Sequence, residues 1–262
     1  MLKKNPSQES FSRREFMRAA AITAVTMVIS GCVASASTPP AESAAEKSGA
    51  EEAKEKIPAT EEQIPTLPSD APKWKASLLE LAVGNLRFVM GKLKSPHQSV
   101  QRREELVGGQ YPFAAVLSCS DSRLPPEIIF DQGLGDLFVV RVAGNVAAFS
   151  DTIASLEYAV EHLHAPLIVV LGHQKCGAIT AALEGTKMEG SLGALMESLQ
   201  PAVEAAKSQE GDKLENAIRA NVHLTVKRLH QESVILAKAV EEGEIDILGA
   251  YYSLETGKVE LI

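Results

Sequence analysis

Three short runs of apolar residues stand out in the middle of the chain. They are rich in Val, Leu, Ile and Ala, and they span Phe113–Ser118, Asp136–Val142 and Pro166–Gly172. A strand with one face in water alternates apolar and polar side chains, whereas a strand buried on both faces reads as a continuous apolar run. The three runs therefore predict strands of a parallel sheet that is covered on both faces.

Helical spacing of apolar residues predicts helices around these strands. Leu78, Leu81 and Leu86 recur near the helical period, and Gly91 is a typical helix stop. At the C-terminus, "IDILGAYYSLETGKVELI" predicts a hairpin that turns around Glu255–Lys258. The pattern is that of an α/β fold in which helices flank a mostly parallel β-sheet. We expect helices over Trp74–Gly91, Ser99–Val107, Thr152–Leu163, a stretch after Cys176, and Asn216–Glu242 as one long helix.

Composition excludes some partners. The chain has 262 residues, of which 45% are hydrophobic, and this is enough to fill one good-sized core. The net charge is −8, and no cluster of Lys and Arg with interleaved aromatic residues is present, so we expect no nucleic-acid partner. The three cysteines, Cys32, Cys119 and Cys176, are too few and odd in number for a disulfide framework.

The first 31 residues have the features of an export signal. Arg13 and Arg14 precede a modest apolar run at Ala19–Ser30, which is too short to span a bilayer. The stretch "SRREFM" resembles a twin-arginine signal, and "ISGC" at Ile29–Cys32 resembles a lipobox, whose cysteine receives a lipid anchor. Taken singly, arginine pairs are common and a short apolar run could be a core helix. The arginine pair, the apolar run and the lipobox in this order at an N-terminus favour export.

Residues 32–72 are predicted to form a lipidated, flexible tether. The segment is rich in Ala, Glu, Ser, Pro and Lys without apolar periodicity, so it cannot bury enough surface to offset its ordering entropy. We therefore expect a signal peptide at 1–31, this tether with its lipid on Cys32, and a folded domain at 73–262. The expected location is the periplasm or cell envelope, with the protein anchored in a membrane.

Two of the predicted strands end in residues that bind metals. Cys119 follows the first strand, and His173 with Cys176 follows the third. Functional groups collect beyond the carboxyl ends of strands in open α/β sheets, so these three side chains can converge. Sulfur and nitrogen donors suit Zn²⁺, and three protein ligands with one exchangeable position are typical of a catalytic zinc, which lowers the pKa of bound water to about 7.

The predicted domain resembles the β-class carbonic anhydrases. The matching motifs are "CSDSR" at Cys119–Arg123, "FVVRVAGN" at Phe138–Asn145, "LEYAV" at Leu156–Val160, and "GHQKCGA", which contains His173 and Cys176. The resemblance implies a parallel sheet with an antiparallel edge strand and one zinc ion per subunit, held by Cys119, His173 and Cys176. It also implies reversible hydration of carbon dioxide to bicarbonate and a proton, in a homodimer or a higher even oligomer.

Asp121 and Arg123 follow the first ligand at alternate positions. Asp121 can accept the hydroxyl proton of the nucleophile at the zinc and so hold an oxygen lone pair toward carbon dioxide. Arg123 can hold the Asp121 carboxylate in a charge-assisted bidentate contact and keep it off the metal. We therefore assign catalytic roles to both residues; a surface salt bridge is the alternative interpretation of Arg123.

The resemblance also assigns a substrate pocket. Gln110 lies nine residues before Cys119, where plant-type members of the family have a glutamine that donates a hydrogen bond to substrate. A second kind of member lacks this glutamine, has a tryptophan three residues before the first cysteine ligand, and lets the aspartate close the fourth position of the zinc. Here that residue is Val116, so we expect the open kind. The other implied pocket positions are Phe138, Ala143, Tyr158 and Gly177.

Two alternative functions use the same residues. Hydrolysis of carbon disulfide or carbonyl sulfide is the nearest, because similar ligand sets serve both reactions within this fold. A zinc-binding lipoprotein without turnover is the other alternative. The Asp121–Arg123 pair argues against it, because metal storage does not need that pair.

Overall fold

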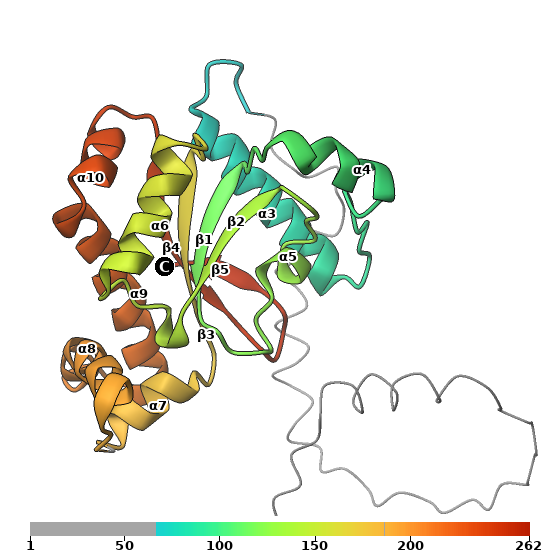
Figure 1. Cartoon of the computed structure of the whole chain (residues 1–262). Coiled ribbons are helices and arrows are strands. Elements are labelled where there is room, and N and C mark those ends of the chain that lie inside the picture. The colour runs from blue at the N-terminus through green and yellow to red at the C-terminus, as the bar shows by residue number, and fades with distance from the viewer. Residues whose placement is uncertain (1–66, 186) are drawn as a thin grey trace, which may run out of the picture. The chain divides into compact units, whose positions relative to one another are not determined.

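The computed structural model describes residues 67–185 and 187–262. They form a five-stranded sheet with the strand order β2-β1-β3-β4-β5 (Figure 1). The strands are β1 at Ala114–Ser118, β2 at Leu137–Arg141, β3 at Leu167–His173, β4 at Asp246–Tyr252 and β5 at Val259–Leu261. The first four run parallel, and β5 pairs antiparallel with β4. The predicted mostly parallel sheet with an antiparallel edge strand is therefore confirmed, as is the C-terminal hairpin.

The predicted signal peptide, with Arg13 and Arg14, and the lipidation site Cys32 lie outside the described residues. So does the predicted tether as far as residue 66. The first described helix, α3, begins at Lys73. In the part of the chain that is described, no helix has both the length and the hydrophobicity that crossing a membrane requires.

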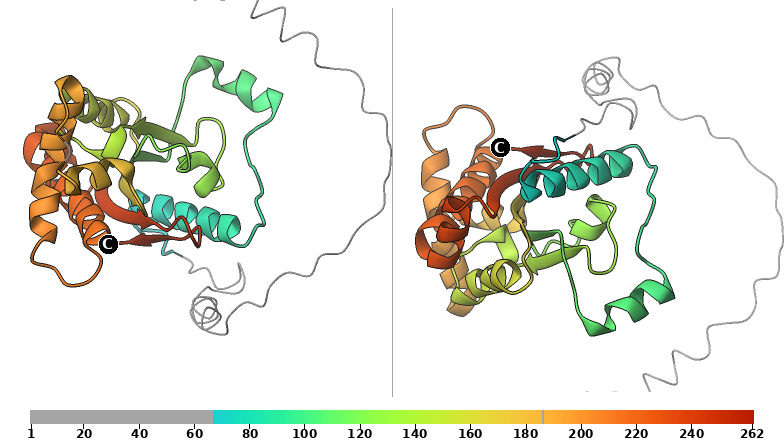
Figure 2. Two further views of the ribbon diagram at one scale, coloured as in Figure 1. Left: turned by 90° about the horizontal axis from the view of Figure 1, so that it is seen from below. Right: turned by 90° about the horizontal axis from the view of Figure 1, so that it is seen from above.

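Helices cover both faces of the sheet (Figures 1 and 2). Because side chains alternate along a strand, neighbouring residues of β1 and β3 serve two different core clusters. Val116 and Val169 belong to the cluster that contains Leu81 of α3, whereas Leu117 and Val170 belong to the cluster built with α6, α9 and α10. The helices are α3 at Lys73–Val89, α4 at Val100–Glu105, α5 at Pro126–Ile129, α6 at Ser150–Glu161, α7 at Gly177–Leu183, α8 at Gly190–Ala206, α9 at Lys213–Glu232 and α10 at Val234–Glu241, with 3₁₀ turns η2 at Leu106–Gly108 and η3 at Ala143–Asn145.

The sequence-based expectation of one long helix over Asn216–Glu242 is wrong. The helix is broken at Ser233, which has extended backbone angles (φ −110°, ψ 110°) and separates α9 from α10. The Ser233 hydroxyl accepts a hydrogen bond from the Leu236 N–H at 3.1 Å and donates one to Glu157 Oε1 of α6 at 2.6 Å. Capping at Ser233 therefore turns the chain, so that Leu236 is buried in the cluster shared with α6.

Burial differs between the central strands and the edge strand on the β2 side. Every residue of β1 and β3 is buried, while every residue of β2 is only partly buried. In register, Ser118 at the end of β1 lies opposite Leu171 of β3 and Arg141 of β2. The chain segments that follow these strands therefore begin side by side at one edge of the sheet.

Candidate metal centre

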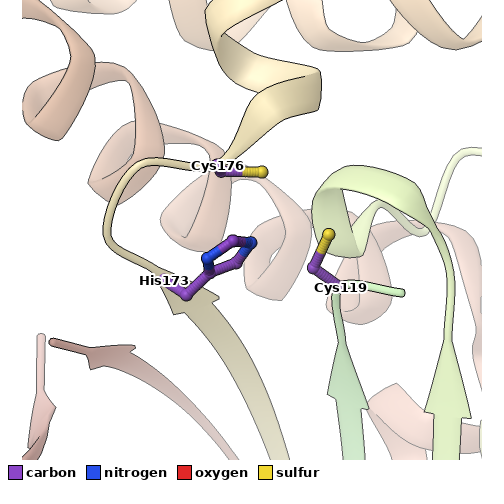
Figure 3. Close-up of side chains that lie close together, drawn as sticks. All are labelled: Cys119, His173 and Cys176. Atoms are coloured by element: carbon purple, nitrogen blue, oxygen red, sulfur yellow. The ribbon is translucent and has the colours of Figure 1, made fainter. Parts of the chain in front are cut away.

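Three metal-binding side chains meet at the carboxyl ends of β1 and β3 (Figure 3). Cys119 directly follows β1, His173 is the last residue of β3, and Cys176 is the N-cap residue of α7. All three are buried, and their ligand atoms lie within 4.8 Å of one another. The convergence predicted for these strand ends is therefore present.

The imidazole of His173 is oriented for metal binding. Its Nδ1 lies 3.0 Å from the backbone oxygen of Gln174, so Nδ1–H donates to that carbonyl and the lone pair is left on Nε2. Nε2 is buried and has no hydrogen-bond partner. A buried nitrogen of this kind is costly unless something binds it, and the ring faces the two cysteine side chains (Figure 3). The donor set and its orientation fit a zinc ion with one open coordination position.

The two thiols influence each other's protonation. Contact with Cys176, with His173 and with the Gly144 N–H lowers the pKa of Cys119 to about 4, although burial acts in the opposite direction. The neighbouring Cys119 sulfur and burial raise the pKa of Cys176. The pair of thiols therefore loses its first proton more readily than its second. Binding of a dication would favour loss of both protons, as expected for thiolate ligands.

The backbone around Cys119 is held by groups to which the sequence motifs assign no role. Gly144 N–H donates to Cys119 Sγ at 3.3 Å. Arg141, at the end of β2, donates from Nε to the Cys119 carbonyl at 3.1 Å and from Nη2 to the Asp121 carbonyl at 2.5 Å. Arg141 lies within the "FVVRVAGN" motif, but only the fold reveals that it fixes the segment carrying the first ligand.

Both oxygens of the Asp121 carboxylate accept hydrogen bonds from Arg123. Arg123 donates from Nε to Oδ1 at 2.9 Å, from Nη2 to Oδ2 at 2.7 Å, and from its backbone N–H to Oδ1 at 2.9 Å. These contacts hold the pKa of Asp121 well below its usual range. Arg123 also reaches the backbone oxygen of Lys175, one residue before the third ligand, at 3.4 Å. The bidentate contact expected from the sequence is therefore present, and Asp121 is ionised at neutral pH.

Comparison with known proteins agrees with this geometry. The family model for carbonic anhydrase matches residues 114–259. The chain is 42% identical over 192 residues to carbonic anhydrase 2 of Mycobacterium tuberculosis, an alignment that covers 72% of this chain and 90% of that protein. The chain belongs to the β-class carbonic anhydrase family. A carbonic anhydrase of Mycolicibacterium smegmatis is 41% identical over 192 residues, covering 72% and 91% of the two chains.

Solved structures of this class share the fold. A β-carbonic anhydrase of Aspergillus fumigatus superposes with a TM-score of 0.56 at 31% identity, covering 62% of this chain and 82% of that one. A tetrameric β-carbonic anhydrase of Sordaria macrospora superposes with a TM-score of 0.55 at 27% identity, covering 61% and 85%. The described domain is thus a carbonic anhydrase in sequence and in fold.

Two of the predicted pocket residues of this carbonic anhydrase adjoin the ligands. Ala143 opens the η3 turn, whose next residue donates to Cys119 Sγ. Gly177 follows the third ligand and is the first residue of α7, where it is exposed. Both therefore border the place where a metal and its substrate would lie.

Gln110 lies at the other end of β1 from the ligands. It precedes Ala114, the first residue of the strand, and is exposed. A strand advances about 3.3 Å per residue, so the path from Ala114 to Cys119 is about 16 Å long. Within one chain, Gln110 is therefore separated from Cys119 by the length of β1.

The predicted pocket residues Phe138 and Tyr158 form an aromatic pair away from the ligands. Their ring centroids are 6.2 Å apart. Phe138 is paired with Ala115 near the start of β2, and Tyr158 is in the last turn of α6, with 47% of its surface exposed. Neither belongs to the group of side chains around Cys119. Within one chain the predicted site residues therefore form two groups. One group surrounds the three ligands, and the other consists of Gln110, Phe138 and Tyr158.

The first prediction distinguishes the expected zinc ligands of this carbonic anhydrase from Asp121, which lies beside them and is not expected to bind the ion. We expect Cys176→Ala to lose its zinc, because two donors hold the ion far more weakly than three. Asp121→Ala should keep about one zinc per chain, because the Asp121 carboxylate is hydrogen-bonded to Arg123 and is not needed as a zinc ligand. Metal analysis of the purified proteins measures both, and Cys32→Ser is the matched cysteine control. A metal-free Asp121→Ala protein would identify Asp121 as a ligand.

Proposed function

We propose that this carbonic anhydrase hydrates carbon dioxide at a zinc ion held by Cys119, His173 and Cys176. The observation that carries the proposal is the buried, partnerless Nε2 of His173 facing two buried thiols. When bound, zinc supplies hydroxide at neutral pH by lowering the pKa of water to about 7. The reaction joins carbon dioxide and water to give bicarbonate and a proton.

Asp121 orients the nucleophile in this proposal. An ionised carboxylate accepts hydrogen bonds and cannot donate them, so the O–H of the nucleophile points toward Asp121. An oxygen lone pair is then left directed toward the carbon of the substrate. Arg123 occupies both carboxylate oxygens and keeps Asp121 from moving onto the metal, which supports the open kind of centre.

The second prediction tests this chemistry directly. Stopped-flow measurement with a pH indicator should detect carbon dioxide hydration that a zinc chelator removes and added zinc restores. Asp121→Ala should lower kcat by roughly 10²–10⁴-fold, the usual contribution of a positioned acid–base group, while zinc stays bound. The control is Glu204→Ala, which removes an exposed acid of α8 that forms an ion pair with Lys207.

Two outcomes would contradict the proposal in different ways. A zinc-loaded protein that hydrolyses carbonyl sulfide or carbon disulfide but does not hydrate carbon dioxide would favour the related hydrolase. A zinc-loaded protein that turns over none of the three substrates would indicate a zinc-binding protein without catalysis.

The complete site is formed between two copies of the chain in this proposal. Gln110, Phe138 and Tyr158 lie apart from the ligands of their own chain, and two large apolar side chains near Gln110 are exposed: Val107 is 86% exposed and Tyr111 is 83% exposed. Exposed large apolar side chains close together are typical of an interface. The tetrameric state of the Sordaria macrospora relative supports a homodimer or a higher even oligomer.

The third prediction is complementation between two inactive proteins. Gln110→Ala has intact ligands, and Cys176→Ala has an intact Gln110. In a mixed dimer the ligands of the first chain meet Gln110 of the second, so one wild-type site is formed. Differently tagged chains, coexpressed and purified through both tags, should be more active than either variant alone. Activity that never exceeds that of the Gln110→Ala homodimer would mean that Gln110 acts within its own chain, or not at all.

Export and anchoring complete the proposed function. The twin arginines, the short apolar run and the lipobox stand in the order of a lipoprotein signal. Twin-arginine export carries folded proteins. A domain that folds around zinc before export would keep Cys119 and Cys176 protected as metal thiolates in an oxidising compartment. The acid-rich segment at 32–72 then serves as a spacer between lipid and enzyme.

The fourth prediction addresses this route. Changing Arg13 and Arg14 together to Lys should leave the protein in the cytoplasm, as judged by cell fractionation. Cys32→Ser should abolish labelling by a radioactive fatty acid and release the enzyme from membranes with its activity intact. Delivery of the double Lys variant to the envelope would contradict the export route, and membrane retention of Cys32→Ser would contradict the lipid anchor.

A further inference from the structure

The turn beside the first ligand has an unusual backbone conformation. In η3, Gly144 is left-handed (φ 69°, ψ 15°), and Asn145 has a φ of 44°. Glycine adopts left-handed angles freely and asparagine more readily than other residues, but two such residues in succession are uncommon outside turns held by surrounding contacts. Two successive left-handed residues next to a ligand therefore indicate that something fixes this turn.

Glycine is favoured at position 144 by its left-handed conformation, and an added side chain would also be crowded. A Cβ added there would lie 3.2 Å from Leu199 of α8 and 3.4 Å from Ala178 of α7. With this backbone, the Gly144 N–H is directed at Cys119 Sγ, 3.3 Å away. The turn thus supplies a hydrogen-bond donor to the sulfur of the proposed zinc ligand.

Asn221 of α9 holds the other side of the same residue. Its Nδ2 donates to the Gly144 carbonyl at 2.7 Å, across 77 positions of the chain. Asn221 is only 4% exposed, so this hydrogen bond is made in the protein interior. Buried hydrogen bonds restrict geometry strongly, because breaking one leaves unsatisfied polar groups. Gly144 is thereby fixed at its carbonyl by α9 while its N–H contacts Cys119.

We propose that Asn221 is a positioning residue for the zinc centre, acting through Gly144 to keep the N–H···S hydrogen bond on Cys119. This inference rests on the proposed function, because it assumes that Cys119 binds zinc. Without the Asn221 amide, the η3 turn relaxes from its left-handed form and the Gly144 N–H moves away from the sulfur. The thiolate then loses a hydrogen bond that orients it and draws electron density from it.

The fifth prediction uses Asn221→Leu, which has a similar shape but no donor. Zinc affinity of the purified full-length chain should fall roughly 10–100-fold, the usual effect of removing a partner that supports a metal ligand. Cobalt(II) bound in place of zinc reports on the sulfur directly. A thiolate without its hydrogen bond gives up charge more easily, so the sulfur-to-cobalt charge-transfer band should move to longer wavelength.

Asn85→Leu is the matched control. Asn85 is also a buried asparagine whose Nδ2 donates to backbone carbonyls, those of Ile129 and Gly257, but at α5 and the C-terminal hairpin. It should lower thermal stability and leave the cobalt band in place. Asn221→Asp, which keeps the size of Asn221 but places an oxygen opposite the Gly144 carbonyl, should reproduce the zinc and cobalt effects of Asn221→Leu.

The outcomes separate this inference from the proposed function. If the wild-type chain binds no zinc, the proposed function fails, and the inference fails with it. If wild-type zinc binding is normal and either folded Asn221 variant keeps both the zinc affinity and the cobalt band, Asn221 has only a structural role and the inference alone is overturned. The same conclusion holds if both Asn221 variants fail to fold while Asn85→Leu folds.

Discussion

The metal centre depends on the parallel pairing of β1 with β3. Ser118 lies opposite Leu171, so Cys119 and His173 leave the sheet at neighbouring points. A slip of one residue would turn every side chain of β1 to the opposite face and carry Cys119 with it. Because both strands are buried on both faces, any such slip would also disrupt two core clusters. Packing of apolar residues therefore sets the geometry of the polar site.

Beyond the strand ends, side chains from other elements replace the regular hydrogen bonds of the sheet. Arg141 binds two carbonyls of the segment that starts at Cys119, and the backbone of Val142 pairs with Ser118 and Ser120. Hydrogen bonds from a charged donor to backbone oxygens are stronger than those between neutral groups. These contacts support the backbone that carries Cys119 and Asp121. Such support would matter in the proposed open centre, because three ligands there hold the ion without a fourth protein donor.

Much of the fold and the ligand set could be predicted from the sequence, because both leave local signals. Continuous apolar runs mark buried strands, and "CSDSR" and "GHQKCG" follow two of them. Helical periodicity continues across Ser233, so the sequence predicts one helix there. The hydrogen bond from Ser233 to Glu157 that accompanies the break joins residues far apart in the chain. Asn221 carries no local signal, since it is one polar residue on an amphipathic helix. Its contact with Gly144 exists only after α9 has packed against the sheet.

The loop before α4, the helix that precedes Gln110, is anchored by contacts with the interior of its own chain. Helix α4 has no buried residue, so its own packing cannot order it. The preceding loop is instead anchored by two buried carboxylates. Asp131 accepts hydrogen bonds from the Lys94 N–H and the Ser95 N–H, and Asp136 contacts His97 Nδ1 at 2.7 Å. Burial alone would raise the pKa of Asp131, but these backbone donors and Arg87 lower it, so its charge persists and the ties remain.

A segment that is ordered before association loses less conformational entropy when a partner binds. In the proposed dimer, contacts inside one chain would thus help to order the surface that completes the site of the other chain.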